Sequence, residues 1–196
     1  MKQSLGAVIF AYPTPIFLIG TYDNNGHPNI APVSWGGICC AKPPCVTVSL
    51  RKATQTFANL IARKVFTISI PSESQLKQVD ACGMTSGRNI NKFVHARFSQ
   101  ARSQVVYAPY IKECLVIVEC KVRHSLELGL HTQFIGEVLD VKADKSVILA
   151  DGLVDLLRIR PLIFGPDTCE YYGVGKMLGK AFATGKKTRQ HHADFP

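Results

Sequence analysis

The stretch SLRKATQTFANLI, residues 49–61, places two adjacent cations, Arg51 and Lys52, between an apolar strand-like run and a helix-like run. Thr54 is a suitable N-cap for a helix that begins directly after it. A helix N-terminus exposes unpaired N–H groups and the positive end of the helix dipole, which together attract anions. An arginine fork, a lysine point charge and the hydroxyl of Ser49 suit a phosphate group. On these residues alone, a phosphate site and a basic loop in solvent are equally good interpretations.

Two further segments have residue types that suit a flat, polar ligand. The segment APVSWGGICC, residues 31–40, holds the single tryptophan, Trp35, before two glycines that allow a ligand close to the backbone. The segment DACGMTSGRNINKF, residues 80–93, places small residues beside Arg88 and Lys92. A core tryptophan and an ordinary loop after a helix are the structural alternatives.

The remaining reactive residue types do not form a recognisable catalytic or metal-binding pattern. His131 has no serine or cysteine arrangement that specifies a hydrolytic triad. The segment CCAKPPC lacks the C-x2-C spacing of zinc and iron–sulfur sites, so no metal is expected. The cysteines are therefore interpreted as structural or incidental thiols. The sequence holds seven of them: Cys39, Cys40, Cys45, Cys82, Cys114, Cys120 and Cys169.

Composition predicts one globular domain over residues 1–186, followed by a frayed basic tail over residues 187–196. The chain has 196 residues, of which 46% are hydrophobic and 19% are charged. Its N-terminus lacks a signal-peptide pattern, so we expect a cytoplasmic protein with reduced thiols. No apolar run approaches the roughly 20 residues of a membrane span.

The net charge of +9 indicates either an anionic partner or simply a basic surface. The cations are dispersed, without a basic run or a basic helical stripe, so nucleic acid is not expected. The sequence also lacks a G-x-G-x-x-G motif after its first strand and a Walker-type loop, which argues against a Rossmann or P-loop nucleotide site.

Most of the chain has strand-like patterning. A hairpin is predicted around Asn25-Gly26, and two long strands are predicted to meet at Gly129. The expected strands are 16–23, 28–36, 45–50, 66–70, 114–128, 131–144 and 161–165.

Helical signals are fewer. Phe57, Leu60, Ile61 and Val65 form one helical face after Thr54. The expected helices after that one are 73–81, opened by a capping box of Ser72 and Gln75, and a short helix at 91–96. Six or seven antiparallel strands with few helices predict a mainly β fold, a β-barrel, rather than a doubly wound sheet.

Several stretches, in this order, carry a family resemblance: VSWGGICC, then PP and VSLRKAT, then DACGMTSGRNINKF, ELGLHTQFIGEVLDV and RPLIFGPDTCEYYGVGKMLGKAF. With these stretches the chain resembles the flavoredoxin branch of the flavin reductase-like family, the split-barrel proteins that bind FMN. The resemblance spans residues 5–185. It implies a split β-barrel of the Greek-key type, a homodimer, and FMN held without a covalent bond.

The resemblance also implies which residues form the site. The flavin ring is expected along residues 33–35, the phosphate near residues 49–54, and His131 beside the ring as a candidate catalytic residue. Tyr171 and Tyr172 are expected at the edge of the site, from the same or the partner subunit. The full set of expected cofactor contacts is Val33, Ser34, Trp35, Ser49, Leu50, Arg51, Lys52, Thr54, Asn59, Cys82, Gly83, Ser86, Gly87, Arg88, Lys92, Tyr171 and Tyr172.

Three functions are compatible with this resemblance. The first is an FMN-dependent oxidoreductase that passes electrons from NADH, NADPH or another donor to flavin, ferric or protein acceptors. The second is a flavoredoxin-type electron carrier that receives electrons from an acidic, ferredoxin-like partner and does not oxidise NAD(P)H, which the positive charge favours. The third is an FMN- or nucleic-acid-binding module without redox turnover.

Overall fold

The computed structural model describes residues 1–184 as a mainly β fold. Its strands are β1 (Thr14–Pro15), β2 (Phe17–Tyr22), β3 (Pro28–Val33), β4 (Gly36–Ala41), β5 (Pro44–Arg51), β6 (Val65–Ile70), β7 (Gln100–Arg102), β8 (Pro109–Ile111), β9 (Val116–Leu128), β10 (His131–Ala143), β11 (Leu162–Gly165) and β12 (Glu170–Gly173). Its helices are α1 (Gln55–Arg63), α2 (Leu76–Met84), α3 (Lys92–His95) and α4 (Leu156–Ile159), with 3-10 turns η1 (Glu73–Gln75) and η2 (Lys145–Val147).

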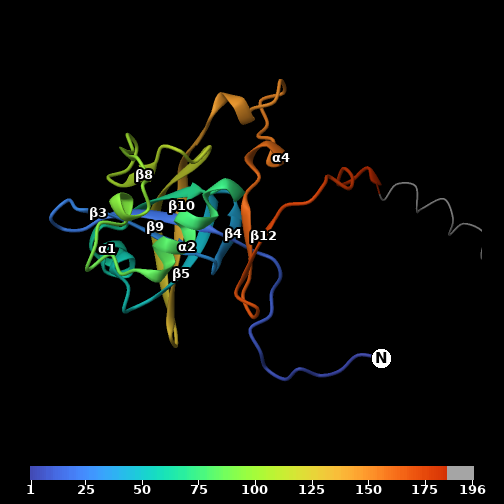
Figure 1. Ribbon diagram of the computed structural model, residues 1–196, viewed down its shortest axis with the longest axis horizontal. Coiled ribbons are helices and arrows are strands. Elements are labelled where there is room, and N and C mark those ends of the chain that lie inside the picture. The colour runs from blue at the N-terminus through green and yellow to red at the C-terminus, as the bar shows by residue number, and fades with distance from the viewer. Residues whose placement is uncertain (185–196) are drawn as a thin grey trace, which may run out of the picture.

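A seven-stranded antiparallel sheet forms the body, in the order β3-β2-β6-β9-β10-β5-β4. The long hairpin of β9 and β10 crosses the centre of the view in Figure 1. The sheet curls around one apolar core, because inward residues of β2, β5, β6, β9 and β10 pack together with Leu60 of α1. The closure is incomplete, since β3 and β4 are the two ends of the sheet. The predicted split β-barrel is confirmed.

A second apolar core covers the outer face of the same sheet. Leu18 and Ile30 point outward from β2 and β3 and pack against α2, α3 and β8, whereas Ile19 points into the barrel. This alternation is the two-residue period of a strand that is buried on both faces. The second core holds α2 and α3 over the β3 side of the split. No helix within residues 1–184 is long and apolar enough to cross a membrane.

Helix α1 begins as the sequence predicts and ends earlier. The Thr54 side chain accepts a hydrogen bond from the Phe57 backbone N–H, as an N-cap does. Lys64 adopts a left-handed conformation with φ of 56°, which ends the helix. The prediction that Val65 belongs to the helical face is wrong, because this residue starts β6 instead.

The other predicted boundaries differ from the structure in segments where glycine, proline and cysteine weaken the strand or helix pattern. The predicted strand 28–36 is too long, since β3 ends at Val33, and Gly36 starts the next strand, β4, which was not predicted. The predicted helix 73–81 is η1 followed by α2, which extends to Met84. Strands β1, β7, β8 and β12 were not predicted. The expected tail at 187–196 lies outside the described residues.

Candidate functional site

A cavity of about 480 Å³ lies at the junction of β3, the N-terminus of α1 and the C-terminus of α2. We call it the basic cavity, because Arg51 and Lys92 both line it. It brings together seven of the predicted contacts, from three separate segments: Arg51, Thr54, Cys82, Gly83, Ser86, Gly87 and Lys92. Its other lining residues are Asn29, Ala31, Pro32, Ala53, Gln55, Thr56, Met84 and Thr85.

Lys92 is the residue of the basic cavity whose environment is hardest to explain without a ligand. Its side chain is buried, with 5% exposure, and its Nζ donates a 2.6 Å hydrogen bond to the Cys82 carbonyl oxygen. Among the described residues it forms no ion pair. Burial lowers the pKa of Lys92, because a desolvated ammonium is disfavoured. A buried cation without a carboxylate partner is costly unless an anion or a polar ligand completes its shell.

Asn29, in the wall of the same cavity, has a side-chain oxygen without a hydrogen-bond partner among the described residues. Its Nδ2 donates to Thr56 Oγ1 at 2.8 Å, while its buried Oδ1 has no hydrogen-bond partner among the described residues. A Cβ on Gly87 would lie 1.9 Å from this Oδ1, so only glycine allows the loop to approach Asn29. Gly87 therefore packs directly over this oxygen and holds the loop of residues 86–88 against β3.

The N-terminus of α1 adds backbone donors. Thr54 Oγ1 donates to the Arg51 carbonyl at 2.9 Å, which fixes the turn between β5 and α1. The N–H groups at the start of a helix have no partner inside it. Arg51 is exposed at the mouth of the cavity. Cation, helix dipole and N–H groups thus converge at one end, which is an arrangement that binds phosphate.

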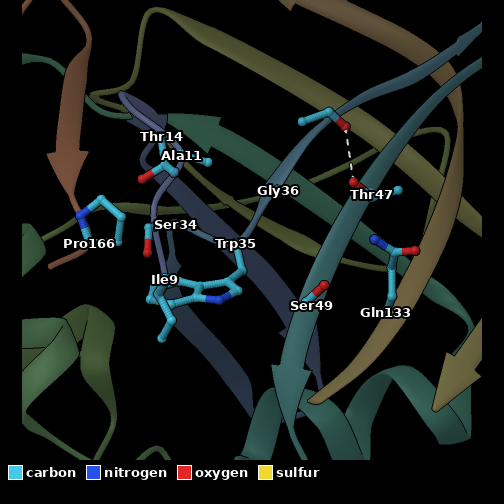
Figure 2. A pocket seen from close by; sticks show the side chains of 11 residues that line it. Ile9, Ala11, Thr14, Ser34, Trp35, Gly36, Thr47, Ser49, Gln133 and Pro166 are labelled. Atoms are coloured by element: carbon cyan, nitrogen blue, oxygen red, sulfur yellow. Dashed lines mark hydrogen bonds between the residues drawn. The ribbon is translucent and has the colours of Figure 1, made fainter. Parts of the chain in front are cut away.

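A second cavity, of about 300 Å³, lies beside β4, β5 and the link between β3 and β4. We call it the tryptophan cavity. Figure 2 shows Trp35 and Ile9 together on one side of it, with Ser49 and Gln133 on the other. Thr47 Oγ1 donates to the Gly37 carbonyl at 3.4 Å, which is the dashed line in Figure 2. Its full lining is Ile9, Ala11, Thr14, Ser34, Trp35, Gly36, Gly37, Thr47, Ser49, Gln133 and Pro166.

Trp35 is a surface residue, not a core residue. It is 37% exposed, and its ring stacks on His131 with 5.9 Å between centroids and 9° between planes. Its carbonyl oxygen accepts a 2.8 Å hydrogen bond from the Ser49 backbone N–H, which joins the link after β3 to β5. His131, the candidate catalytic residue, lies directly opposite Arg51 in the register of β10 and β5. Trp35 and His131 therefore form one flat, partly open surface.

Both cavities are lined by residues of the segment 29–37 and of strand β5. On β5, Thr47 and Ser49 line the tryptophan cavity and Arg51 lines the basic cavity, while Val46 and Val48 of this strand point into the barrel core. Residues two apart on a strand share a face and lie about 7 Å apart. The outer face of β5 therefore leads from one cavity to the other.

Several predicted contacts line neither cavity. Val33 and Leu50 belong to the barrel core, and Lys52 is paired with Glu127 at 2.9 Å. Their contact with a cofactor stays a prediction.

Arg88 and Asn59 line a third, adjoining cavity of about 380 Å³. Asn59 is buried, accepts a 2.7 Å hydrogen bond from the Gln55 amide, and donates to Thr21 Oγ1 at 3.0 Å. It positions Gln55, which lines the basic cavity. Contact between these residues and a cofactor is likewise a prediction.

The two tyrosines of β12 are also outside both cavities. The Tyr171 hydroxyl donates to Asp80 of α2 at 3.1 Å, and burial, followed by this aspartate, raises the pKa of Tyr171 to about 12. The Tyr172 hydroxyl bonds to Glu170. They remain predicted contacts at the edge of the site.

Asn29, Gln55 and Thr56 are among the lining residues of the basic cavity that were not predicted from the sequence. Asn29 lies within a strand and Thr56 within a helix, 27 residues apart. A polar residue in a strand is usually exposed, and only the packing of α1 against β3 buries this pair. The one available indication is that Thr56 belongs to the same helix start as Thr54.

Comparison with known proteins identifies the family. The family model of the flavin reductase like domain matches residues 9–164. The chain belongs to the flavin reductase-like family. Flavoredoxin of Desulfovibrio vulgaris (Miyazaki F) is similar in structure, with a TM-score of 0.91 and 48% identity, covering 95% of this chain and 100% of that chain. A flavoredoxin from Methanosarcina acetivorans has a TM-score of 0.88 and 28% identity, covering 96% of this chain and 99% of that chain.

An Aquifex aeolicus protein is a relative in sequence. It is 28% identical over 167 residues, which are 82% of this chain and 83% of that protein. Membership in the flavin reductase-like family supports a flavin as the cofactor class. The described residues fit a flavin phosphate, because the basic cavity holds a buried cation and a helix N-terminus.

Proposed function

We propose that the protein binds FMN without a covalent bond, with the phosphate and ribityl chain in the basic cavity and the ring towards Trp35. Lys92 carries this proposal, because it is a buried cation whose single partner within residues 1–184 is a carbonyl oxygen. The phosphate of FMN is a dianion and its ribityl chain supplies hydroxyl donors and acceptors. These groups would complete the hydrogen bonding of Lys92.

The predicted contacts have distinct roles within this proposal. Arg51 and the helix start at Thr54 bind the phosphate, with Ser49 and Lys52 contributing from the same junction. The loop of residues 86–88 closes over the phosphate, since Gly87 already lies against Asn29. The backbone at Gly37 is open, because a Cβ there would meet no atom within 4 Å, and this leaves room for a flat ring.

The proposed activity is that of an oxidoreductase. FMN held there would supply two-electron chemistry, by which electrons from NADH or NADPH would reach flavin, ferric or protein acceptors. The protein's part is to bind the phosphate, to orient the ring and to leave one ring face open to the donor. His131 stacks on Trp35 and is placed to hold or release a proton at the edge of that surface. This role of His131 is part of the proposal.

A second function is favoured by a specific observation. The net charge of +9 and the 48% identity to a flavoredoxin suit an electron carrier that docks an acidic, ferredoxin-like protein. In that case the electrons come from the partner, and the protein does not oxidise NAD(P)H. The basic mouth formed by Arg51 beside the stacked Trp35 and His131 would then be the docking point.

The assembly and the location are also proposals. We infer a homodimer from family resemblance and from exposed apolar side chains on the β9–β10 hairpin, such as Leu126 at 55% and Leu128 at 52% exposure. A reducing compartment, such as the cytoplasm, suits the seven unpaired cysteines.

One set of experiments tests these statements. The purified protein is expected to be yellow, or to become yellow with added FMN, and Arg51→Ala is expected to weaken FMN binding at least tenfold. Under anaerobic conditions, bleaching by NADH or NADPH within seconds supports the oxidoreductase. Bleaching by reduced ferredoxin alone supports the carrier. A colourless protein that does not take up FMN refutes the cofactor proposal.

A further inference from the structure

The hairpin of β4 and β5 carries three of the seven cysteines, and neither cavity uses them. Lys42 and Pro43 form its turn, and Cys40 lies directly opposite Cys45 in the strand register. Cys40 is exposed, while Cys45 is 7% exposed. Strand β4 is the free end of the sheet, so reagents in solution reach this hairpin.

The register suits a covalent bond between the two thiols. Directly opposed residues in antiparallel strands have Cα atoms roughly 4.5 or 5.5 Å apart. Both separations fall within the range of about 4.4 to 6.8 Å that disulfides require. Opposed residues also project from the same face of the sheet. A register shift between Ile38 and Cys40 leaves Cys39 without an opposite residue, so Cys40 is the direct partner of Cys45.

The described side chains around Cys40 and Cys45 do not form a metal site. Glu137 of β10 is the other neighbour of Cys45 in the register, and it is paired with Arg123. Within residues 1–184, no three histidine, cysteine or acidic side chains are close enough to hold a metal ion. Burial raises the pKa of Cys45, with Cys40 and Glu137 adding to the rise and Arg123 opposing it. Cys45 is thus kept as a thiol, while Cys40 is accessible.

We propose that Cys40 and Cys45 form a reversible disulfide when a hydroperoxide oxidises Cys40. In the first step the Cys40 sulfur takes the terminal hydroxyl group of the peroxide as the O–O bond breaks; the Cys40 proton leaves with the other oxygen as an alcohol, or as water, and Cys40 becomes a sulfenic acid. In the second step the Cys45 sulfur attacks that sulfur, and the Cys45 proton leaves with the hydroxyl group as water. The two electrons of the new S–S bond have gone to the peroxide, and a dithiol restores both thiols.

The proposed disulfide would lie close to the tryptophan cavity. Cys45 and Thr47 share the outer face of β5, and Thr47 and Gly37 line the tryptophan cavity from the two strands of the hairpin. The bond would lie about 7 Å along the strand from that cavity wall. A cross-link there restrains the hairpin that forms the wall. This inference does not depend on which cofactor occupies the cavities.

The test uses the full-length protein as purified, after reduction and removal of the reductant. It is treated with stoichiometric hydrogen peroxide, denatured and alkylated. The wild-type protein is expected to lose two alkylated thiols from its seven, to lose about 2 Da in mass through the release of two hydrogens, and to give a peptide linking Cys40 to Cys45. Cys40→Ser and Cys45→Ser are each expected to abolish the loss. Cys169→Ser, at an exposed cysteine outside the hairpin, is expected to keep it.

Four results would overturn the proposal. The first is full alkylation of the peroxide-treated wild-type protein. The second is a loss of two thiols that persists in both hairpin variants. The third is a cross-linked dimer on a non-reducing gel, which would assign the bond to two copies. The fourth is Cys40 as sulfinic or sulfonic acid with Cys45 still free. Because Cys40 is exposed, its serine variant keeps the test valid even if Cys45→Ser folds poorly.

Discussion

Replacing Lys92 with methionine should weaken FMN binding without a matching loss of stability. Methionine keeps most of the buried volume and removes the charge. A hydrogen bond to a charged group contributes about 1.5 to 3 kcal/mol. Since about 1.4 kcal/mol corresponds to a tenfold change in affinity, we expect the Kd for FMN to rise about 10- to 150-fold. The reason is that Lys92 is buried and has no anionic partner among the described residues.

The apoprotein should respond differently to the same change. Lys92→Met leaves the Cys82 carbonyl without its donor, which costs stability, and removes a buried ammonium, which regains it. These terms oppose each other, so the free energy of unfolding of the apoprotein should change by no more than about 1 kcal/mol. Lys77→Met, at an exposed lysine of α2, is the matched control and should alter neither quantity.

The contribution of Lys92 to the stability of the apoprotein should depend on pH. Burial lowers the pKa of Lys92 in the folded apoprotein, while the unfolded chain keeps the ordinary value of about 10.4. Between these two values the unfolded state binds more protons, so the contribution of Lys92 to stability rises with pH. The difference in stability between wild type and Lys92→Met should therefore grow in favour of wild type as the pH rises towards about 10.

The assays are fluorescence titration with FMN and chemical denaturation of the apoprotein at several pH values. An unchanged Kd in Lys92→Met would refute the role of this residue. A loss of apoprotein stability as large as the loss of affinity would show that Lys92 acts through the fold instead. A stability difference that is flat with pH would contradict the burial argument.

Three further predictions concern the frame of the site. Gly87→Ala should weaken FMN binding at least tenfold in titrations, because its Cβ would displace Asn29, while Gly37→Ala, which meets no atom within 4 Å, should fold with unchanged stability. Thr54→Ala should lower the free energy of unfolding by about 1 kcal/mol in urea denaturation, through loss of the N-cap; an unchanged value would contradict the cap. In ultraviolet titration, Tyr171 should ionise near its pKa of about 12, and a Tyr171→Phe variant should lack that step.

The sequence predicted the parts of the site that lie on continuous segments. Arg51 and the cap at Thr54 lie within one turn, so local patterns were sufficient to predict the helix start, which is confirmed; the anion site beside it stays a prediction. The family resemblance then assigned the anion. The fold class followed from the number of antiparallel strand signals.

The remaining features depend on packing between distant segments. The buried pair of Asn29 and Thr56 exists because α1 packs against β3 across the split. Strand β4 was missed because its exposed residues do not alternate in polarity and its glycines resemble a turn. Cys82 and Gly83 were expected in a loop, and they lie in the last turn of α2, whose end the sequence does not mark with a C-cap glycine.

The outer face of β5 also limits how this chain can change in length. A one-residue insertion between Cys45 and Arg51 would turn Val46, Val48 and Leu50 out of the barrel on one side of the insertion, because faces alternate with every residue. The insertion would disrupt the barrel core and the walls of both cavities at the same time. Natural variation and protein engineering along this strand should therefore proceed by substitution, whereas the exposed turn at Gly129 can accept added residues.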